Sequence, residues 1–438
     1  GNAVSERTGK GYLPAYSIVR KGGVKVAVLG YTNAANASLM DASCVSGISF
    51  KSLLPLVQED VDKVRSKEKP QVVIVVAHTS MGKGDGQNLE RQGLDLFNSL
   101  KGVDVLVTGH DHSTKVLKTD STVLLDCGRA GQYACLADIK LVVRGGKVIS
   151  RSLSGEVESF GSENYDTAME EAFKSDYEKV RNFNASHVGE VKKDLVSREF
   201  YYRQCDYMNF LHALAFSAWP VDISLSATLL IDGMVPAGEV RYQDIRKIYP
   251  YDNKLIVLRL TGAEILRYLE ASYDAWISTV PGPAEGSHVL RITQTKDYAT
   301  GGLKWKLAKS PANFDSAAGI RYTVDVTKPY GSRVTVSGMA DGSPFEMDKD
   351  YSVAITSYRS TGSGGLMKAA GLMDARSVED RIIYRGPEFR TILYRYLKKH
   401  GSIDPAVVGD PNVVGSWRFV PDFAPEAIKA DVQLIYGK

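Results

Sequence analysis

Two histidines, His110 and His112, follow an apolar run at residues 105–107 and could bind a metal ion or a phosphate group. We expect the run to be a buried strand that ends in a tight turn at Gly109, where a side chain would obstruct the backbone. Residues two apart in an extended segment point the same way, so both imidazoles can face one point. Imidazole nitrogen is a good ligand for Zn, Mn, Co or Fe.

A third histidine, His78, ends the apolar run of residues 71–77. Ligands of open α/β sheets bind at the carboxyl ends of the strands, so two buried strands that each end in histidine predict one metal or phosphate site. The alternative is that His78, His110 and His112 are structural histidines in polar loops. Three of the seven histidines lie at these two strand ends, which favours the metal site.

The segments around these histidines alternate between strand and helix patterns, which is typical of an α/β layer fold. The hydrophobic spacing predicts a hairpin at 12–30, helices at 52–67 and 88–100, and strands at 71–78, 105–108 and between 121 and 152. Residues 163–183 carry many charges among spaced apolar residues. We interpret this stretch as an exposed helix that links two domains.

The second half of the chain repeats the mixture of helix and strand. We expect helices at 204–218, 239–248, 262–274 and 386–399, with strands at 221–227, 254–260 and several between 320 and 356. Thr261 and Glu264 have the spacing of a capping box, which predicts the start of the third of these helices.

The length, composition and net charge of the chain limit the class of protein. A length of 438 residues predicts two domains, and 44% hydrophobic with 24% charged residues is typical of a soluble globular protein. A net charge of +3 gives no reason to expect a nucleic-acid polymer or an anionic membrane as partner. No apolar run reaches about 18 residues, so no transmembrane helix is expected, and no signal peptide is present, although one could have been removed before Gly1.

The four cysteines form no CxxC pair and no zinc-finger spacing. We interpret all of them as buried free thiols, and they do not settle the redox compartment. They are Cys44, Cys127, Cys135 and Cys205.

The segment Gly109-His-Asp-His112, together with an upstream strand that ends in Ala77-His78 and is followed by Gly82, resembles the second half of a calcineurin-like metallophosphoesterase domain. More narrowly, the chain resembles the bacterial 5′-nucleotidase and 2′,3′-cyclic-nucleotide 2′-phosphodiesterase/3′-nucleotidase family, over nearly its whole length. The resemblance implies an α/β protein in which a partial calcineurin-like α-β-β-α sandwich precedes an α/β nucleotide-binding domain. Its implied limits are a metal domain at 1–160, a linker helix at 161–186 and a nucleotide-binding domain at 187–438.

The resemblance implies a site with two divalent ions, about 3.5–4 Å apart and bridged by a carboxylate, which activate water for attack on phosphorus. It assigns His78, His110 and His112 as ligands, and Zn, Mn, Co or Mg as the ions. The family's DxH motif, its bridging Asp and its GNH[DE] motif are absent from this sequence, and Asn2-Ala3-Val4 matches a segment that follows them. We therefore expect a chain that lacks the first third of the metal domain, and we assign no catalytic residue.

A metal domain without its first strands would expose a sheet edge and an apolar face. We therefore expect a covering partner, either a dimer mate or the N-terminal fragment, or else a poorly behaved protein. The sequence does not distinguish an expressed fragment, proteolysis, a misassigned gene start or a natural short form.

The nucleotide-binding half retains the family's motifs. The resemblance implies that Tyr251 and Tyr358 sandwich the nucleobase and that Asn253 is a polar contact, while Arg359 either pairs with phosphate or is merely solvated. Stacking on an aromatic ring contributes roughly 1–3 kcal/mol per base and tolerates any base. The alternative is that both are ordinary loop tyrosines among the 23 in the chain. Gly364 stands where the 5′-nucleotidase branch carries an Asp, which favours the cyclic-phosphodiesterase branch.

These observations predict metal-dependent hydrolysis of nucleotide phosphate esters for nucleotide salvage, impaired in this chain by the missing motifs. The alternative is a nucleotide- or nucleoside-binding protein without catalysis. The resemblance implies a periplasmic or cell-surface bacterial protein. The sequence leaves open the metal, the base, the oligomeric state and the choice between cyclic, 3′ and 5′ substrates.

Overall fold

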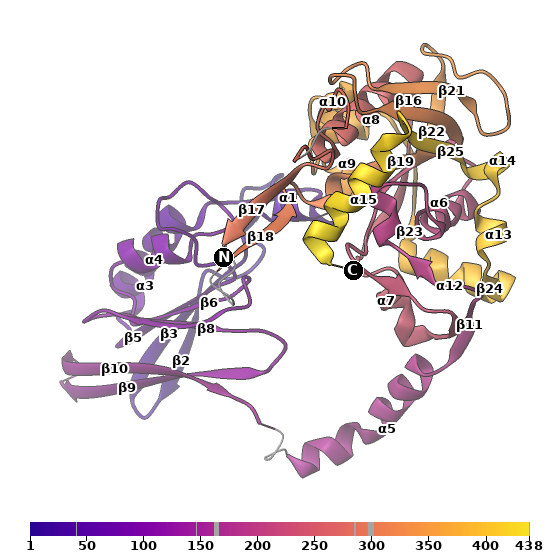
Figure 1. The fold of residues 1–438 in the computed structure, drawn as a ribbon. Coiled ribbons are helices and arrows are strands. Elements are labelled where there is room, and N and C mark those ends of the chain that lie inside the picture. The colour runs from indigo at the N-terminus through magenta and orange to yellow at the C-terminus, as the bar shows by residue number, and fades with distance from the viewer. Residues whose placement is uncertain (41, 146, 162–165, 284–285, 297–301, 438) are drawn as a thin grey trace. The chain divides into compact units, whose positions relative to one another are not determined.

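The computed structural model describes residues 1–40, 42–145, 147–161, 166–283, 286–296 and 302–437. The chain divides into two compact units, Gly1–Glu170 and Glu171–Lys438. Each unit mixes helices and strands (Figure 1), so the predicted α/β class is confirmed.

The first unit is built on a six-stranded sheet with the order β2-β3-β5-β6-β8-β7. Its four inner strands are parallel, and the two edge strands are antiparallel to their neighbours. The apolar runs of the sequence become the inner strands because such strands are covered on both faces. The strands are β2 (Ser17–Lys21), β3 (Val24–Tyr31), β5 (Val72–Ala77), β6 (Val105–Thr108), β7 (Thr114–Lys118) and β8 (Val123–Cys127).

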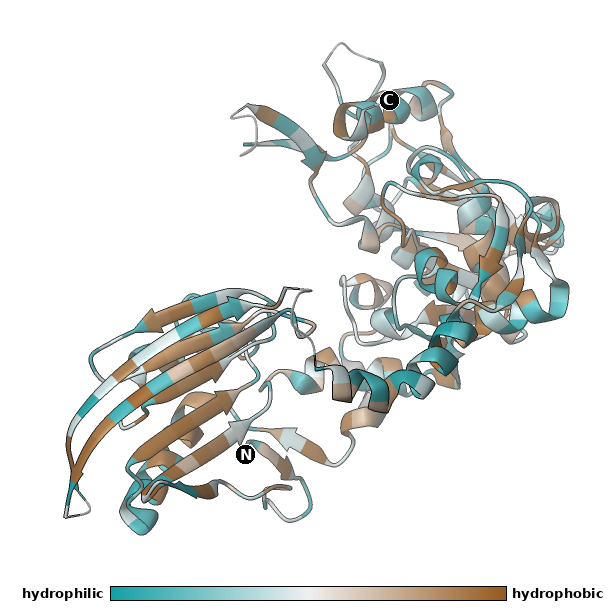
Figure 2. Cartoon of the chain, turned by 90° about the horizontal axis from the view of Figure 1, so that it is seen from below, coloured by the Kyte–Doolittle hydropathy of each residue, from teal (hydrophilic) through white to brown (hydrophobic). Residues whose placement is uncertain are grey.

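Two layers cover this sheet. Helices α3 (Leu53–Glu68) and α4 (Gly93–Ser99) lie on one face, and Leu53, Val57, Val61 and Val64 form a fully buried stripe at helical spacing. A long hairpin of β9 (Tyr133–Arg144) and β10 (Lys147–Ser159) covers the other face (Figure 1). Figure 2 shows hydrophobic residues along the strands of this unit, alternating with hydrophilic ones in the long hairpin.

Short elements complete the first unit: β1 (Ala3–Ser5), α1 (Asn36–Leu39), α2 (Ala42–Val45) and β4 (Ile48–Phe50). Helix α5 (Thr167–Asn184) follows the hairpin and has no buried residue. The predicted linker 161–186 contains α5, and its residues 162–165 lie outside the described residues. Within the described part of the chain, no helix combines the length and the apolar character needed to cross a membrane.

A disulfide joins Cys127 at the end of β8 to Cys135 in β9. The expectation of four free thiols is therefore wrong, because the hairpin folds back and brings the two Cα atoms to 5.6 Å. Cys44 is free and exposed, and Cys205 is free and buried.

The second unit contains a five-stranded sheet, β19-β13-β22-β16-β23, and two three-stranded sheets, β21-β20-β25 and β15-β11-β24. Helices α6 (Asp206–Ala218), α8 (Gly262–Trp276), α12 (Phe389–His400) and α15 (Phe423–Tyr436) pack around them. The strands are β11 (His187–Val191), β13 (Ile223–Ala227), β15 (Gly238–Arg241), β16 (Lys254–Thr261), β19 (Asp315–Ala318), β20 (Ile320–Asp325), β21 (Val334–Met339), β22 (Asp350–Thr356), β23 (Ile382–Glu388), β24 (Ser402–Ile403) and β25 (Gly415–Val420).

The local sequence signals of this unit have mixed outcomes. The capping box is confirmed, because the Glu264 N–H donates to Thr261 Oγ1 at 3.2 Å and the Thr261 N–H donates to Glu264 Oε2 at 2.8 Å. The single helix expected at 239–248 is wrong. Strand β15 pairs there with β11, and only α7 (Ile245–Ile248) is α-helical, so long-range pairing overrides the local pattern.

Candidate functional site

The carboxyl ends of the adjacent strands β5 and β6 bring His78 and His110 together. His78 Nε2 lies 3.1 Å from His110 Nδ1. Two nitrogen ligands of one tetrahedral zinc ion are separated by about 3.4 Å, so this spacing suits two imidazoles on one ion. The other ring nitrogen of His110 lies 3.0 Å from Glu90 Oε1, and this contact orients the ring.

The backbone of this loop differs from the expectation. Gly109 does not have a positive φ; instead His110 and His112 do, at 87° and 57°. The segment is therefore not extended, and the argument that residues two apart point the same way does not apply. His112 is exposed, and within the described residues no hydrogen bond joins it to the other two histidines.

Burial, and then the nearness of His110 and His112, lower the pKa of His78 from its usual value. The ring is therefore held neutral at neutral pH, which is the form that binds a metal ion.

Two carboxylates that sequence reasoning missed are Asp111, between His110 and His112 in the sequence, and Asp126, on the neighbouring strand β8. Asp126, at the end of β8, is fully buried, and the Ser113 hydroxyl bridges it to Asp111. Burial, and then the hydrogen bond and charge of Asp111, raise the pKa of Asp126 to about 6. Its position at the carboxyl end of an apolar strand was the signal that could have identified it.

The donor set is incomplete for a metal centre. Among the described residues, no group of three or more His, Cys, Asp or Glu side chains is arranged to hold a metal ion. The imidazoles of His78 and His110 converge, but none of the carboxylates in the described part of the chain bridges at their meeting point. The residues present do not fit a two-metal centre, and we derive no reaction step through metal ions.

The second unit contains a cavity of about 210 Å³ that brings the predicted base-stacking residues together. Strands β16 and β22 are antiparallel neighbours, with Leu255 opposite Thr356. The loop before β16 and the loop after β22 therefore emerge side by side, and the Lys254 N–H donates to Ser357 Oγ at 3.0 Å between them. Tyr251 and Asn253 come from the first loop, and Tyr358 and Arg359 come from α9 (Ser357–Ser360) in the second.

The two tyrosine rings are available to a ligand. Tyr251 is 47% exposed and Tyr358 is 44% exposed, and within the described residues neither ring stacks on another aromatic ring. Leu225, Ala227 and Leu229 give the cavity an apolar floor. This combination is suited to a flat, weakly polar group.

Arg359 is buried at 3% exposure, so it is not a solvated loop residue. Its guanidinium lies 2.5 Å from the carboxylate of Asp315, at the start of β19. Burial, the largest single influence, acts to lower the pKa of Arg359, but the charge and hydrogen bond of Asp315 together with the charge of Tyr268 outweigh it, so the pKa is raised. Sequence reasoning missed Asp315, and no local pattern marks it.

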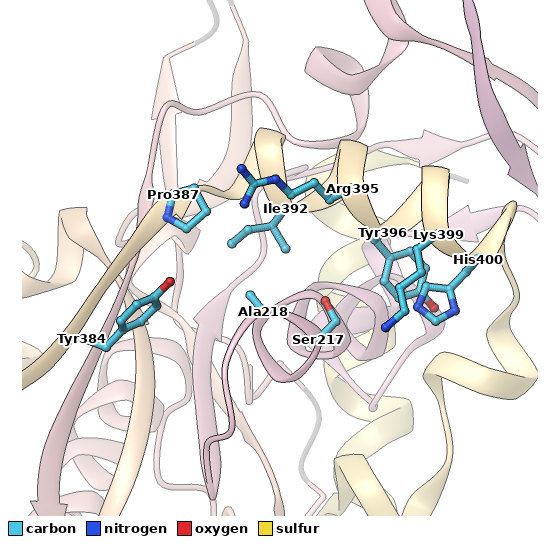
Figure 3. A pocket seen from close by; sticks show the side chains of 9 residues that line it. All are labelled: Ser217, Ala218, Tyr384, Pro387, Ile392, Arg395, Tyr396, Lys399 and His400. Carbon is cyan, nitrogen blue, oxygen red and sulfur yellow. The ribbon is translucent and has the colours of Figure 1, made fainter.

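A second cavity of about 210 Å³ lies in the same unit, and its chemistry differs (Figure 3). Arg395, Lys399 and His400 project from α12 and line this cavity together with Ser217 and Ala218. Its two tyrosines already have ring partners: Tyr384 stacks on Trp219, and Tyr396 stacks on His400. The two cavities therefore do not differ in size. They differ in that the tyrosine rings of the first have no aromatic partner among the described residues, which makes the first the better candidate for binding a flat ligand.

The chain is thus a two-unit α/β protein whose second unit contains a cavity lined by two half-exposed tyrosine rings. Residues 187–371 match the family described as 5′-nucleotidase, C-terminal domain. Over 437 residues the chain is 21% identical to the trifunctional nucleotide phosphoesterase protein YfkN of Bacillus subtilis, covering 87% of this chain and 28% of that protein. Over 203 residues it is 27% identical to the 2′,3′-cyclic-nucleotide 2′-phosphodiesterase/3′-nucleotidase of Haemophilus influenzae, covering 43% of this chain and 26% of that protein.

The fold also resembles a solved putative 5′-nucleotidase from Staphylococcus aureus, with a TM-score of 0.64, 16% identity and coverage of 95% of this chain and 77% of that one. The match of residues 187–371 to the 5′-nucleotidase C-terminal domain, with the relatives above, confirms the resemblance predicted from the motifs. The chain spans 26–29% of the length of the first three relatives, so it corresponds to a part of each of them.

Proposed function

We propose that this chain takes part in metal-dependent hydrolysis of nucleotide phosphate esters, and that its second unit binds the nucleoside part of the substrate. The observation that carries this proposal is the cavity lined by the half-exposed rings of Tyr251 and Tyr358, by Asn253 and by several apolar side chains. Half-exposed rings over an apolar floor suit a nucleobase, and stacking accepts any base. The names of the related proteins support the same class of substrate.

On the first unit we assign His78, His110 and His112 to a divalent ion, which could be Zn, Mn, Co or Mg. The 3.1 Å approach of the first two rings supports this assignment. Hydrolysis also requires carboxylate ligands that the described residues do not bring to this point. A partner subunit or a further protein segment would have to supply them.

The Cys127–Cys135 disulfide supports a location outside the cytosol, at the periplasm or the cell surface, because disulfides persist in oxidising compartments. Release of nucleosides for salvage is a function suited to that location.

The incomplete donor set also favours a second candidate function, nucleoside or nucleotide binding without catalysis. Both candidates predict binding of adenosine, and only the first predicts turnover.

The deciding experiment follows hydrolysis of 2′,3′-cyclic AMP, 3′-AMP and 5′-AMP with and without Mn²⁺, Co²⁺ or Zn²⁺, alongside calorimetric titration with adenosine. Metal-dependent turnover that disappears in His110→Ala would support the hydrolase. Adenosine binding without turnover would support the second candidate, a binding protein without catalysis. A protein that neither binds adenosine nor hydrolyses the nucleotides would contradict both candidates.

A further inference from the structure

The charged side chains that line the nucleoside cavity form an ion pair with each other. Asp315 and Arg359 are the charged residues among those that line it, and each of these side chains is 3% exposed. Their charges cancel, so the cavity presents no net charge to a ligand.

All five N–H groups of the Arg359 guanidinium have acceptors within the protein. Nε donates to Asp315 Oδ2 at 3.2 Å, and Nη2 donates to Asp315 Oδ1 at 2.5 Å and to the Ala312 carbonyl at 2.8 Å. Nη1 donates to Asn313 Oδ1 at 3.2 Å and to the Ser363 carbonyl at 2.7 Å. No N–H remains for the phosphate of a ligand.

These acceptors lie on two segments, so Arg359 joins the loop of Tyr358 to residues 312–315. The guanidinium carbon lies 5.4 Å from the centre of the Tyr358 ring and supports it by a cation–π contact. The loop closes tightly on this group, because a Cβ at Gly364 would overlap both Arg359 Nη1 and Asn313 Oδ1. Gly364 also has a φ of +79°, which favours glycine.

Asp315 is in turn fixed to the core of the unit. The hydroxyl of Tyr268, a fully buried residue of α8, donates to Asp315 Oδ2 at 2.5 Å. A chain of contacts therefore runs from α8 through Asp315 and Arg359 to the Tyr358 ring.

We propose that Asp315 and Arg359 are positioning residues of the nucleoside cavity, which hold the Tyr358 loop in its binding geometry and leave the cavity to recognise an uncharged nucleoside. This inference rests on the proposed function. It requires that adenosine, 3′-AMP and 5′-AMP bind the metal-free protein with similar affinity.

The test is calorimetric titration of these three ligands in EDTA. For the wild type we expect affinities within about threefold of one another. Arg359→Gln, Arg359→Lys and Asp315→Asn should each lower the affinity for all three ligands by the same factor, about tenfold or about 1.4 kcal/mol. Lysine keeps the positive charge but not the five donors. A loss of affinity in Arg359→Lys would therefore show that the hydrogen bonds of Arg359 matter, and not its charge alone.

Arg333→Gln is the matched control, because Arg333 is also buried in this unit and paired with Asp274, but does not line the cavity. It should leave adenosine affinity unchanged and leave hydrogen exchange of residues 357–365 as in the wild type. Exchange of that segment should be faster in Arg359→Gln and Asp315→Asn.

A wild type that binds the nucleotides far more tightly than adenosine would overturn the inference, and that comparison needs no variant. Arg359 variants that lose affinity for AMP alone, or for no ligand, would also overturn it. A folded wild type that binds none of the three would instead contradict the proposed function.

Discussion

His110 and Tyr358 both lie on loops that follow a strand, but the two units hold them in different ways. His110 has a positive φ, and its ring is fixed by one contact with His78 and one with Glu90. The Tyr358 loop is fastened by a buried arginine whose five donors are all satisfied. The aromatic cavity is therefore pre-organised without a ligand, whereas the histidine loop depends on a few exposed contacts.

The two units also show that a sequence motif can be present while the site it belongs to lacks some of its ligands. In the second unit the two tyrosines of the cavity and the Asp315–Arg359 pair that fastens the Tyr358 loop belong to one compact unit. In the first unit the histidines are present, but the described residues form no full donor set. Perturbing each unit separately should therefore affect ligand binding in the second and mainly stability in the first.

The largest expected effect is on the cavity. Tyr251→Ala and Tyr358→Ala should each lower adenosine affinity by roughly 1–3 kcal/mol, because each removes a stacking face. Isothermal titration would measure this, with Tyr251→Phe as the conservative variant and Tyr330→Ala as an exposed tyrosine outside the cavity. Unchanged affinity in both alanine variants would make the two residues ordinary surface tyrosines.

An effect of comparable size is expected from the disulfide of the first unit. Replacing Cys127 and Cys135 together by serine should lower the free energy of unfolding of this unit by about 2.5 kcal/mol, because the closed loop is short. Denaturant unfolding would measure the change, and Cys44→Ser, at an exposed free thiol, is the control. The adenosine affinity of the second unit should not change, and a parallel loss of affinity would contradict the separation of the two units.

The second unit should in turn respond to acid through His212. This ring is fully buried between Ser224 and Ser316, and burial lowers its pKa from 6.5 to about 3. The unfolded chain binds the proton near pH 6.5 and the folded chain does not, so the stability contribution is lost as the pH falls below 6.5. The loss amounts to about 2 kcal/mol at pH 5. His212→Gln should flatten this pH dependence in thermal unfolding, and an unaltered profile would rule out His212 as its source.

The smallest effect is expected from metal ions. With two converging imidazoles, Mn²⁺ or Zn²⁺ at a concentration equal to its Kd should stabilise the first unit by about 0.4 kcal/mol. Thermal unfolding with and without EDTA would detect the shift, and His110→Ala should abolish it. A shift of several kcal/mol would mean that the site is more complete than its donors indicate.

The sequence predicted those features that depend on local pattern. The apolar runs before His78 and His110 become the parallel strands β5 and β6, so their carboxyl ends meet as expected. The Thr261–Glu264 capping box lies entirely within four residues, and it forms as predicted.

Features that depend on long-range contacts were not predictable in this way. Asp315 looks like an ordinary strand residue until the fold places it against Arg359. The pairing of Cys127 with Cys135 depends on the β9–β10 hairpin turning back over the sheet. The positive φ of His110 is set by the loop around it rather than by its own preference, since non-glycine residues seldom adopt this conformation.

The pairing of strands in the second unit has a consequence for its synthesis. Strand β11, the first of this unit, pairs in parallel with β24, and β20 pairs in parallel with β25. Two of its sheets thus need residues 402–420 before they can close. The six-stranded sheet of the first unit lies within residues 17–127, so it can form while the rest of the chain is still being synthesised. The second unit cannot complete these two sheets until β24 and β25 have been synthesised, so its sheets form late in biosynthesis.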